Sequence, residues 1–468
     1  MPDQNQTKPP DTETAFVCDC DEYVRSACQG EPFFKEHEGR RFCVLHYPDK
    51  DKLEDFRAAL KRKRRKKDYN FRGVWFPEEK NFEKFEFSTD ADYDNATFSA
   101  KFSAKADFSC ATFSTDADFS YATFSAKPDF RSAKFSAEAD FSNAKFSAEA
   151  DFSSAEFSAK AKFSCATFSA NAYFNSATFS ADANFSWATF SANADFNSAK
   201  FSANADFSWA TFSADANFEG GTFKNYVSFA GSNEKGFGKQ SRLNFQSTHI
   251  EKPERVSFHT LYLKPHWFIN ADCRKFEFID CGWNHNLKQE LGGATKAKIS
   301  APHRLLAITY RQLADNAEAN HRYHEASRFR YNAFESRRIE KFRGFVPWRL
   351  DWWYWLASGY GESVGKAFIV FVALFALFAF GYGRSGFEQS GKGNAANVTQ
   401  GAAIQPDTVG KPLKWKEAFV YSFNVSILQK PEPKPLTLAA KILVSLETVL
   451  GPAQAALLAL AVRRRFMR

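Results

Sequence analysis

Phenylalanine recurs at alternating gaps of five and six residues from Phe108 to Phe223, and the residues between are mostly small or polar. Alanine stands two positions before nearly every one of these phenylalanines, as in Ala139-Asp140-Phe141. This period matches neither the 3.6-residue period of a helix nor the two-residue alternation of a strand. Similarity at a fixed period is typical of a solenoid. We therefore expect short straight segments joined by corners, with Phe and Ala inside and the polar residues in water.

The residue two places after each six-spaced phenylalanine indicates how many units make one turn. One set, whose members are 22 apart, is small: Cys110, Ser132, Ser154, Ser176, Ser198 and Gly220. The interleaved set is mostly bulky: Tyr121, Asn143, Cys165, Trp187 and Trp209. A turn of 11 residues would stack both sets in one column and gives no reason for this difference. The pattern favours a four-sided coil of 22 residues, and a duplication history without structural meaning is the alternative.

The repeat resembles the pentapeptide-repeat family, whose unit is a small residue, any residue, Leu or Phe, a small polar residue and any residue. The likeness extends over Ala91–Phe223, with one extra residue in every second unit. It implies a right-handed quadrilateral β-helix, and we assign residues 81–283 to this β-helix and its cap. The phenylalanine spacing falls to four between Phe98 and Phe102, which predicts an irregular first coil.

Length and composition suggest further domains around the repeats. The 468 residues are enough for two or more domains. Residues 1–14 are polar and contain no secretory signal, so we expect a disordered tail. Without such a signal, the eight cysteines favour reduced thiols or metal ligands over a disulfide framework.

Residues 15–80 form a small module with thiol and imidazole groups. Thiolates and imidazole suit tetrahedral zinc, and a segment this short needs support for its core. The predicted zinc ligands are Cys20, Cys28, Cys43 and His46, with Cys18 as the first substitute. The alternative is that these are free buried cysteines.

A run of seven basic residues, Lys61–Lys67, follows in the same module. Such a run can bind nucleic acid or anionic lipid, or it can be a solvated helix end. Some pentapeptide-repeat rods imitate DNA with an acidic surface, but Ala91–Phe223 holds 16 acidic against 9 basic residues and is only mildly acidic. We therefore do not expect nucleic acid as a partner.

Residues 284–350 are predicted to be a helical linker. Two apolar stripes flank Asn316–Asn320, which indicates an antiparallel helical hairpin. His321 and His324 lie three residues apart, but no third ligand accompanies them, so an exposed polar face is the preferred interpretation.

The last segment, residues 351–468, has two apolar stretches, Ala367–Gly383 and Ile442–Val462, each long enough to span a membrane. An aromatic cluster, Arg349–Gly361, precedes the first stretch and is typical of a membrane interface. Basic residues flank the outer end of each stretch. The pattern predicts a multi-pass protein of the plasma (inner) membrane with both termini in the cytoplasm and residues 384–435 outside.

Between the two stretches, Trp415–Leu428 is aromatic and amphipathic but too polar to span. This order of span, half-length helix and span resembles the two-transmembrane pore module of potassium-channel-like proteins, which are tetramers. The resemblance implies a pore-like segment at Asn424, Val425, Ser426 and Ile427, and polar or hinge positions in the second span at Glu447, Gly451 and Pro452. Bacterial proteins that join pentapeptide repeats, a linker ending in a GYGE-like segment such as Gly359–Glu362, and a pore module are similar to the whole chain.

The chain departs from the pore module at the place of the selectivity filter. Potassium filters need a TVGYG-like loop, whereas Ile427–Pro431 contains no glycine. The chain also lacks a phosphate-cradling glycine loop and a nucleophile elbow, so we expect no enzyme. Two functions are consistent with these features: an oligomeric ion channel with a cytoplasmic rod, and a membrane-anchored scaffold that binds protein partners along its β-helix.

Overall fold

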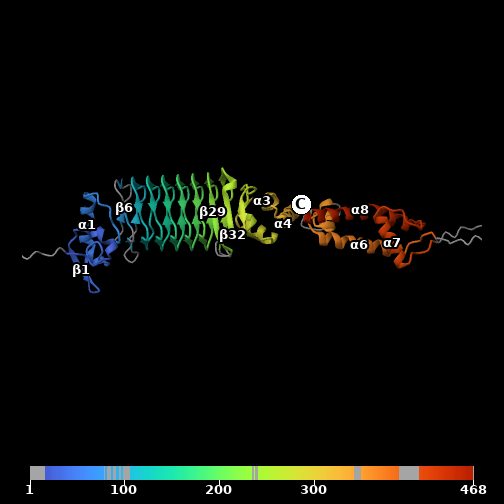
Figure 1. The fold of residues 1–468 in the computed structure, drawn as a ribbon, viewed down its shortest axis with the longest axis horizontal. Helices are drawn as coiled ribbons and strands as arrows, with labels where there is room; N and C mark the ends of the chain where they lie inside the picture. Colours follow the sequence, from blue (N-terminus) through green and yellow to red (C-terminus); the bar gives the residue numbers. More distant parts are fainter. Residues whose placement is uncertain are drawn as a thin grey trace, which may run out of the picture. The chain divides into compact units, whose positions relative to one another are not determined.

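The computed structural model describes residues 16–77, 80–81, 86–87, 91–93, 96–98, 106–233, 237, 241–341, 349–388 and 410–466. The predicted tail, residues 1–14, lies outside them. The chain divides into two compact units, residues 1–284 and 285–468 (Figure 1). The first unit holds the Cys/His module and the β-helix, and the second holds the helices, so each is described by itself.

Short parallel strands build a four-sided solenoid, as predicted, and their stacking is visible in Figure 1. The solenoid has about eight turns. The first side comprises β6 (Ala91–Asp92), β10 (Ala117–Asp118), β13 (Ala139–Asp140), β17 (Ala161–Lys162), β21 (Ala183–Asn184), β25 (Ala205–Asp206), β29 (Val227–Asn233), β32 (Val256–Leu263) and β33 (Glu277–Ile279). The second comprises β3 (Trp75–Phe76), β7 (Thr97–Phe98), β11 (Thr123–Phe124), β14 (Lys145–Phe146), β18 (Thr167–Phe168), β22 (Thr189–Phe190) and β26 (Thr211–Phe212).

The other two sides have the same construction. The third comprises β5 (Glu86–Phe87), β9 (Thr112–Phe113), β12 (Lys134–Phe135), β16 (Glu156–Phe157), β20 (Thr178–Phe179), β24 (Lys200–Phe201), β28 (Thr222–Phe223) and β31 (His249–Ile250). The fourth comprises β4 (Lys80–Asn81), β8 (Ala106–Asp107), β15 (Ala150–Asp151), β19 (Ala172–Tyr173), β23 (Ala194–Asp195), β27 (Ala216–Asn217) and β30 (Leu243–Asn244).

The register confirms the coil of 22 residues. Ala139 pairs with Ala161, and Phe146 pairs with Phe168, which places equivalent side chains of successive coils above one another. Trp187 and Trp209 stack at one corner with ring centroids 5.2 Å apart. The two sets of corner residues therefore form separate columns, because alternate corners lie on different edges of the rod.

Phenylalanine rings fill the interior of the rod. The ring of Phe163 stacks on Phe141 at 4.9 Å and on Phe185 at 4.8 Å, with interplanar angles of 2° and 3°. Neighbouring stacks meet edge to face, as Phe152 and Phe163 do at 5.4 Å and 88°. Burial of each ring contributes about 2 kcal/mol to folding.

The corners depend on a repeated turn. Asp140 accepts a hydrogen bond at 2.8 Å from the backbone N–H of Ser142, and Asn143 then adopts a φ of 60°. The same left-handed conformation occurs at every second corner from Cys110 to Gly220. Side chains there point outward, which explains why a bulky Trp187, 59% exposed, is tolerated. The backbone conformation remains unfavourable for any residue except glycine.

Two irregularities interrupt the repeat. Phe124 pairs with Phe98, which lies 26 residues earlier and not 22, so four extra residues enter this early coil. The phenylalanine spacing predicted an irregularity in the first coil, but the preceding pair, Phe76 and Phe98, has the regular separation of 22. The fourth side is also broken where Pro128 replaces the usual alanine, and two isolated bridges, from Asp129 to Asp107 and to Asp151, connect its parts. Pro128 has no N–H and cannot make the bond that the Ala150 N–H makes to the Asn171 carbonyl.

Aromatic residues cover both ends of the stack. At the start, Phe71 stacks on Tyr93 at 5.0 Å, and the ring of Phe76 lies 6.2 Å from Tyr93. At the other end, Phe278 stacks on Phe258 at 5.5 Å, beside Trp283 of β34 (Gly282–Trp283), which pairs with β32. These aromatic contacts cover the last coils, as terminal repeats must do to shield the core from water.

The Cys/His module lies before the first coil. It consists of a 3-10 segment, Glu22–Cys28, a β-hairpin formed by β1 (Phe33–His37) and β2 (Arg40–Cys43), a short turn, Lys50–Lys52, and the helix α1 (Leu53–Arg65). Phe56 of α1 packs against Phe76 at 5.5 Å, so the module covers the N-terminal end of the phenylalanine stack.

The second unit is helical. It contains α2 (Leu287–Lys296), α3 (Pro302–Ala319), α4 (Tyr323–Lys341), α5 (Leu350–Ser358), α6 (Val364–Tyr382), α7 (Trp415–Ser426) and α8 (Leu438–Phe466). Helices α3 and α4 form the predicted hairpin, and α6, α7 and α8 pack on one another. The core of this bundle comprises Phe378, Ala379, Tyr382, Phe387, Ala418, Tyr421, Val425 and Ala440.

Candidate functional site

Three thiols and one imidazole gather within the N-terminal module. The ligand atoms of Cys18, Cys28, Cys43 and His46 all lie within 4.8 Å of one another, and all four residues are buried. Tetrahedral zinc with sulfur ligands at 2.3 Å needs sulfur atoms roughly 3.8 Å apart. A small contraction would bring these atoms to that spacing, so the cluster has the donor set and the size of a closed structural metal site.

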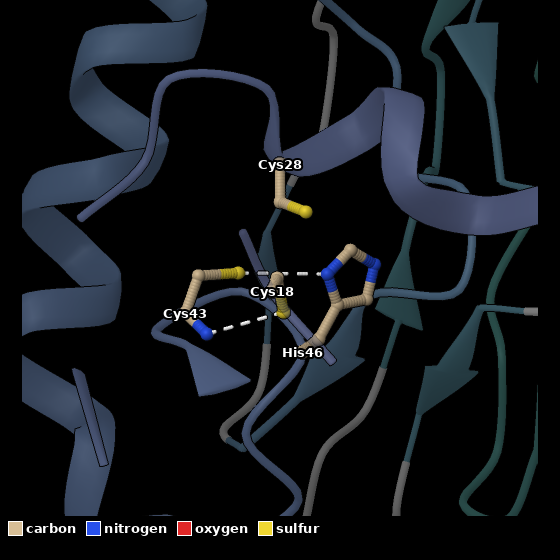
Figure 2. A group of neighbouring side chains, drawn as sticks. All are labelled: Cys18, Cys28, Cys43 and His46. Atoms are coloured by element: carbon tan, nitrogen blue, oxygen red, sulfur yellow. Dashed lines mark hydrogen bonds between the residues drawn. The ribbon is translucent and has the colours of Figure 1, made fainter. Parts of the chain in front are cut away.

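Hydrogen bonds already orient the ligands (Figure 2). Nδ1 of His46 lies 3.5 Å from Sγ of Cys43, and the backbone N–H of Cys43 donates to Sγ of Cys18 at 3.3 Å. On its other side, Nε2 of His46 lies 3.1 Å from the carbonyl oxygen of Arg72. A proton on Nε2 satisfies that carbonyl and leaves Nδ1 as the metal ligand, which is the usual arrangement for a metal-bound histidine.

Hydrogen bonds within the cluster shift the pKa values of its members in different directions, and those with Cys18 and Cys20 raise the pKa of the Cys28 thiol. Hydrogen bonds from Cys20, Cys28 and Cys43 hold the pKa of the Cys18 thiol well below its usual range. Burial disfavours a charged imidazole, but hydrogen bonds with Cys18, Cys20 and Cys43 outweigh it and raise the pKa of His46 to about 11. A metal binds thiolate and neutral imidazole, so a metal entering the cluster would displace the protons held by His46 and by the remaining thiols.

A buried lysine lies beside the cluster. Lys52 is fully buried, donates to the carbonyl of Leu45 at 2.8 Å and sits over the ring of Phe56 at 4.7 Å. Burial lowers the pKa of Lys52 well below its usual value, while Cys43 and Cys18 act in the opposite direction. Three thiolates around a divalent ion would leave a net negative charge, and that charge would favour the ammonium form of Lys52.

The structure brings together Cys28, Cys43 and His46 as predicted, but Cys18 takes the position given to Cys20. Sγ of Cys20 lies 3.8 Å from Sγ of Cys28, beside the cluster and outside the group of four. The C-x-C spacing allowed either cysteine to be a ligand. The backbone places Cys18 in the group of four, because the N–H of Cys43 donates a hydrogen bond to its sulfur.

The basic run forms the end of α1. Lys63 is buried and bonds to Asp68 at 2.6 Å and to the carbonyl of Ala27 at 3.1 Å. Arg62 pairs with Glu31 at 2.6 Å. Part of the run thus stabilises the module, which reduces the charge available to bind nucleic acid or lipid.

In the second unit, α6 and α8 are long and apolar enough to cross a membrane. Their most apolar stretches have mean hydropathies of 2.3 and 1.6, and only 22% and 17% of those residues are buried. A core helix of a soluble domain would be mostly covered. The two helices coincide with the two apolar stretches of the sequence and extend slightly beyond them.

A carboxylate is buried among these helices. Glu447 of α8 is 1% exposed and accepts hydrogen bonds from three hydroxyl groups. Tyr382 of α6 and Ser422 of α7 donate to it, and Ser426 donates at 3.1 Å. Glu447 therefore faces the back of α7, where it connects all three helices and avoids the cost of an unpaired carboxylate in lipid.

Most of the pore-like segment is helical. Asn424, Val425 and Ser426 form the last turn of α7, and Ile427 follows as its C-cap. Val425 and Ser426 are buried against the bundle, whereas Ile427 is 49% exposed. The segment thus has no extended filter-like loop at these four positions.

Gly451 lets α7 approach α8 closely. A Cβ at Gly451 would lie 2.7 Å from Oγ and 3.1 Å from Cα of Ser426, which leaves no room for a side chain. The next residue, Pro452, lies inside α8, which runs as one helix from Leu438 to Phe466. Gly451, one of the positions given as a hinge by the resemblance, therefore allows α7 to pack closely against α8.

Helix α8 has two different exposed faces. Large apolar residues cover one of them, and among them are Ile442, Leu446, Val449 and Leu450, each at least 44% exposed. The other face, at spacings of three and four, carries the exposed polar or small residues Lys441, Ser445, Thr448, Ala456 and Ala459. The buried residues Glu447, Gly451 and Gln454 lie on a third face of the helix.

Sequence reasoning missed the partners of Glu447. Ser422 and Ser426 are spaced four apart on α7 and so share one face, a signal that the sequence did contain. Tyr382 lies 65 residues from Glu447, and no local pattern joins them.

Comparison with protein-family models, with curated proteins and with solved structures finds no match to this chain. The pentapeptide-like solenoid and the two apolar helices therefore rest on the sequence pattern and the structure.

Proposed function

We propose that this chain is a membrane protein in which a cytoplasmic pentapeptide-type rod is coupled to a two-span, pore-like domain that forms an ion channel. The solenoid and the two long apolar helices are compatible with a membrane-anchored repeat protein. Ion conduction is the further step of the proposal.

The proposal rests mainly on the two different exposed faces of α8. Lipid matches the face with Ile442 and Leu446. On the other face the hydroxyls of Ser445 and Thr448 donate to carbonyls of α8 itself, at 2.9 Å and 2.7 Å, but the exposed ammonium group of Lys441 is costly in lipid. Small residues on the same face, such as Ala456, favour close approach of neighbouring helices. Both features support several copies that surround one axis with α8 innermost.

Two spans cannot enclose a water path alone, so the channel requires a homo-oligomer, and the resemblance to potassium-channel-like modules favours a tetramer. The ion is a separate matter. Asn424–Ile427 has no glycine-rich loop of carbonyl groups, which argues against potassium selectivity by that route.

The same observation favours the second candidate function, a membrane-anchored scaffold with a non-conducting pore module. In that case the rod would bind protein partners, and its exposed Trp187–Trp209 corner is a surface of the kind that partners use. Conduction distinguishes the two functions.

Purified full-length protein reconstituted in planar bilayers should conduct ions. Ser445→Leu should lower the unitary conductance by about half or more, because it places a bulky apolar group on the axis. The matched control is Ala453→Leu, an exposed position three residues after Leu450 on the apolar face, and it should leave conductance unchanged. Silent bilayers from well-folded protein would favour the scaffold, and an effect of Ala453→Leu equal to that of Ser445→Leu would contradict the assigned axis.

The proposed location is the plasma (inner) membrane, with both termini cytoplasmic, because basic residues flank the outer ends of both spans. Topology reporters inserted at Gln400 and fused after Arg468 should give opposite answers. Identical answers from both positions would mean that only one of the two helices crosses.

We propose that the metal of the N-terminal cluster is zinc, held by Cys18, Cys28, Cys43 and His46. A Cys3His donor set suits zinc, and the absence of an open coordination position gives it a structural role. The module covers the N-terminal end of the phenylalanine stack, so the metal would stabilise the cap of the rod.

Full-length protein should contain about one zinc ion per chain by elemental analysis. Cys18→Ser and Cys43→Ser should abolish binding, whereas Cys20→Ser, the matched control two residues after Cys18, should retain it. Loss of zinc in Cys20→Ser with retention in Cys18→Ser would show that Cys20 is the ligand in place of Cys18. Absence of zinc from the unsubstituted protein and from every variant would refute the site.

A further inference from the structure

The turn between α5 and α6, which we call the GYGE turn (Gly359–Glu362), has an unusual backbone. Gly359, Tyr360 and Gly361 have φ values of 55°, 65° and 73°, so three consecutive residues are left-handed. Tyrosine rarely adopts this conformation, because its Cβ crowds the backbone. Contacts elsewhere must therefore hold the turn in place.

Contacts with α4 and α8 do so. The Tyr360 side chain is buried, donates to Oε2 of Glu335 at 2.9 Å and stacks on Phe334 at 5.2 Å. On the opposite side, a Cβ at Gly361 would lie 3.2 Å from Cδ2 of Leu460. The turn is thus wedged between α4 and the C-terminal part of α8.

The last residue of the turn places a charge at the centre of this contact. The Glu362 side chain is only 2% exposed, and its Oε1 accepts from Nε of Arg330 at 2.9 Å and from Nη1 of Arg464 at 2.8 Å. Oε2 accepts from Oγ of Ser327 at 2.8 Å. A buried carboxylate requires such partners, and loss of one of them is strongly destabilising.

The network extends in both directions. Nη1 of Arg330 pairs with Glu318 of α3 at 2.7 Å, and this ion pair adds the first helix of the hairpin to the network. In α8, the side-chain N–H of Gln454 donates to the carbonyls of Ala357 at 2.8 Å and Ala367 at 2.9 Å, on either side of the GYGE turn. A continuous path of polar contacts therefore joins α3, α4, the turn and α8.

We propose that Glu362 couples the α3–α4 hairpin to the C-terminal end of α8, so that a displacement of the hairpin moves that end of the helix. The hairpin precedes the apolar helices in the chain, and α8 is the helix assigned to the channel axis. The effect on conduction rests on the proposed function, whereas the mechanical coupling does not.

Hydrogen exchange of the full-length protein in lipid nanodiscs tests the coupling from both sides. Arg330→Ala, in α4, should speed amide exchange of residues 457–464 of α8 at least about tenfold. Arg464→Ala, in α8, should speed exchange of residues 327–335 of α4 to a similar extent. The matched controls are Arg328→Ala and Arg463→Ala, exposed positions on the same two helices, and they should leave the other helix unchanged.

Faster exchange confined to the substituted helix would overturn the proposal, since it would show a local ion pair without transmission. If Arg330→Ala fails to fold, Glu362→Gln keeps the side-chain shape and should speed exchange in both helices. In bilayers, Arg464→Ala should change open probability by about threefold or more, with unitary conductance unaltered. Silent bilayers would refute the proposed channel and leave the exchange result to decide the coupling.

Discussion

Stacked phenylalanine rings and neighbouring β-strands require nearly the same spacing, and the first unit depends on this match. Strands in a sheet lie about 4.8 Å apart. The ring centroids of Phe141 and Phe163 are 4.9 Å apart, so each coil can satisfy its backbone hydrogen bonds and its ring contacts together. A unit with one large and one small inward residue then fills a square interior, and every other position is free to be polar.

A stack of this kind must end somewhere, and its two ends explain the neighbouring modules. The Cys/His module places Phe56 against Phe76 at one end, and Trp283 packs beside Phe278 at the other. The Cys3His cluster lies in the module that covers the N-terminal end, and a module with so small a core needs another source of stability.

The period of the sequence predicted the coil, since contacts between Phe163 and its neighbours repeat at a constant separation. The helical hairpin and the two apolar helices could also be predicted from the sequence, because each depends on the local hydrophobic pattern. The sequence could not predict that Cys18 joins the cluster in place of Cys20, or that Tyr382 covers Glu447. Both depend on how distant backbone segments meet. Sequence reasoning also placed the GYGE turn in the linker but gave no role to Glu362.

The central functional claim is that one face of α8 meets an aqueous axis and the other meets lipid. Spin labels at Ser445 and Leu446, read for collisions with a water-soluble nickel chelate and with oxygen in reconstituted full-length protein, test it directly. The account predicts that the label at 445 meets the nickel chelate and the label at 446 meets oxygen. Oxygen-dominated collisions at both positions would place the whole exposed surface of α8 in lipid and contradict the account.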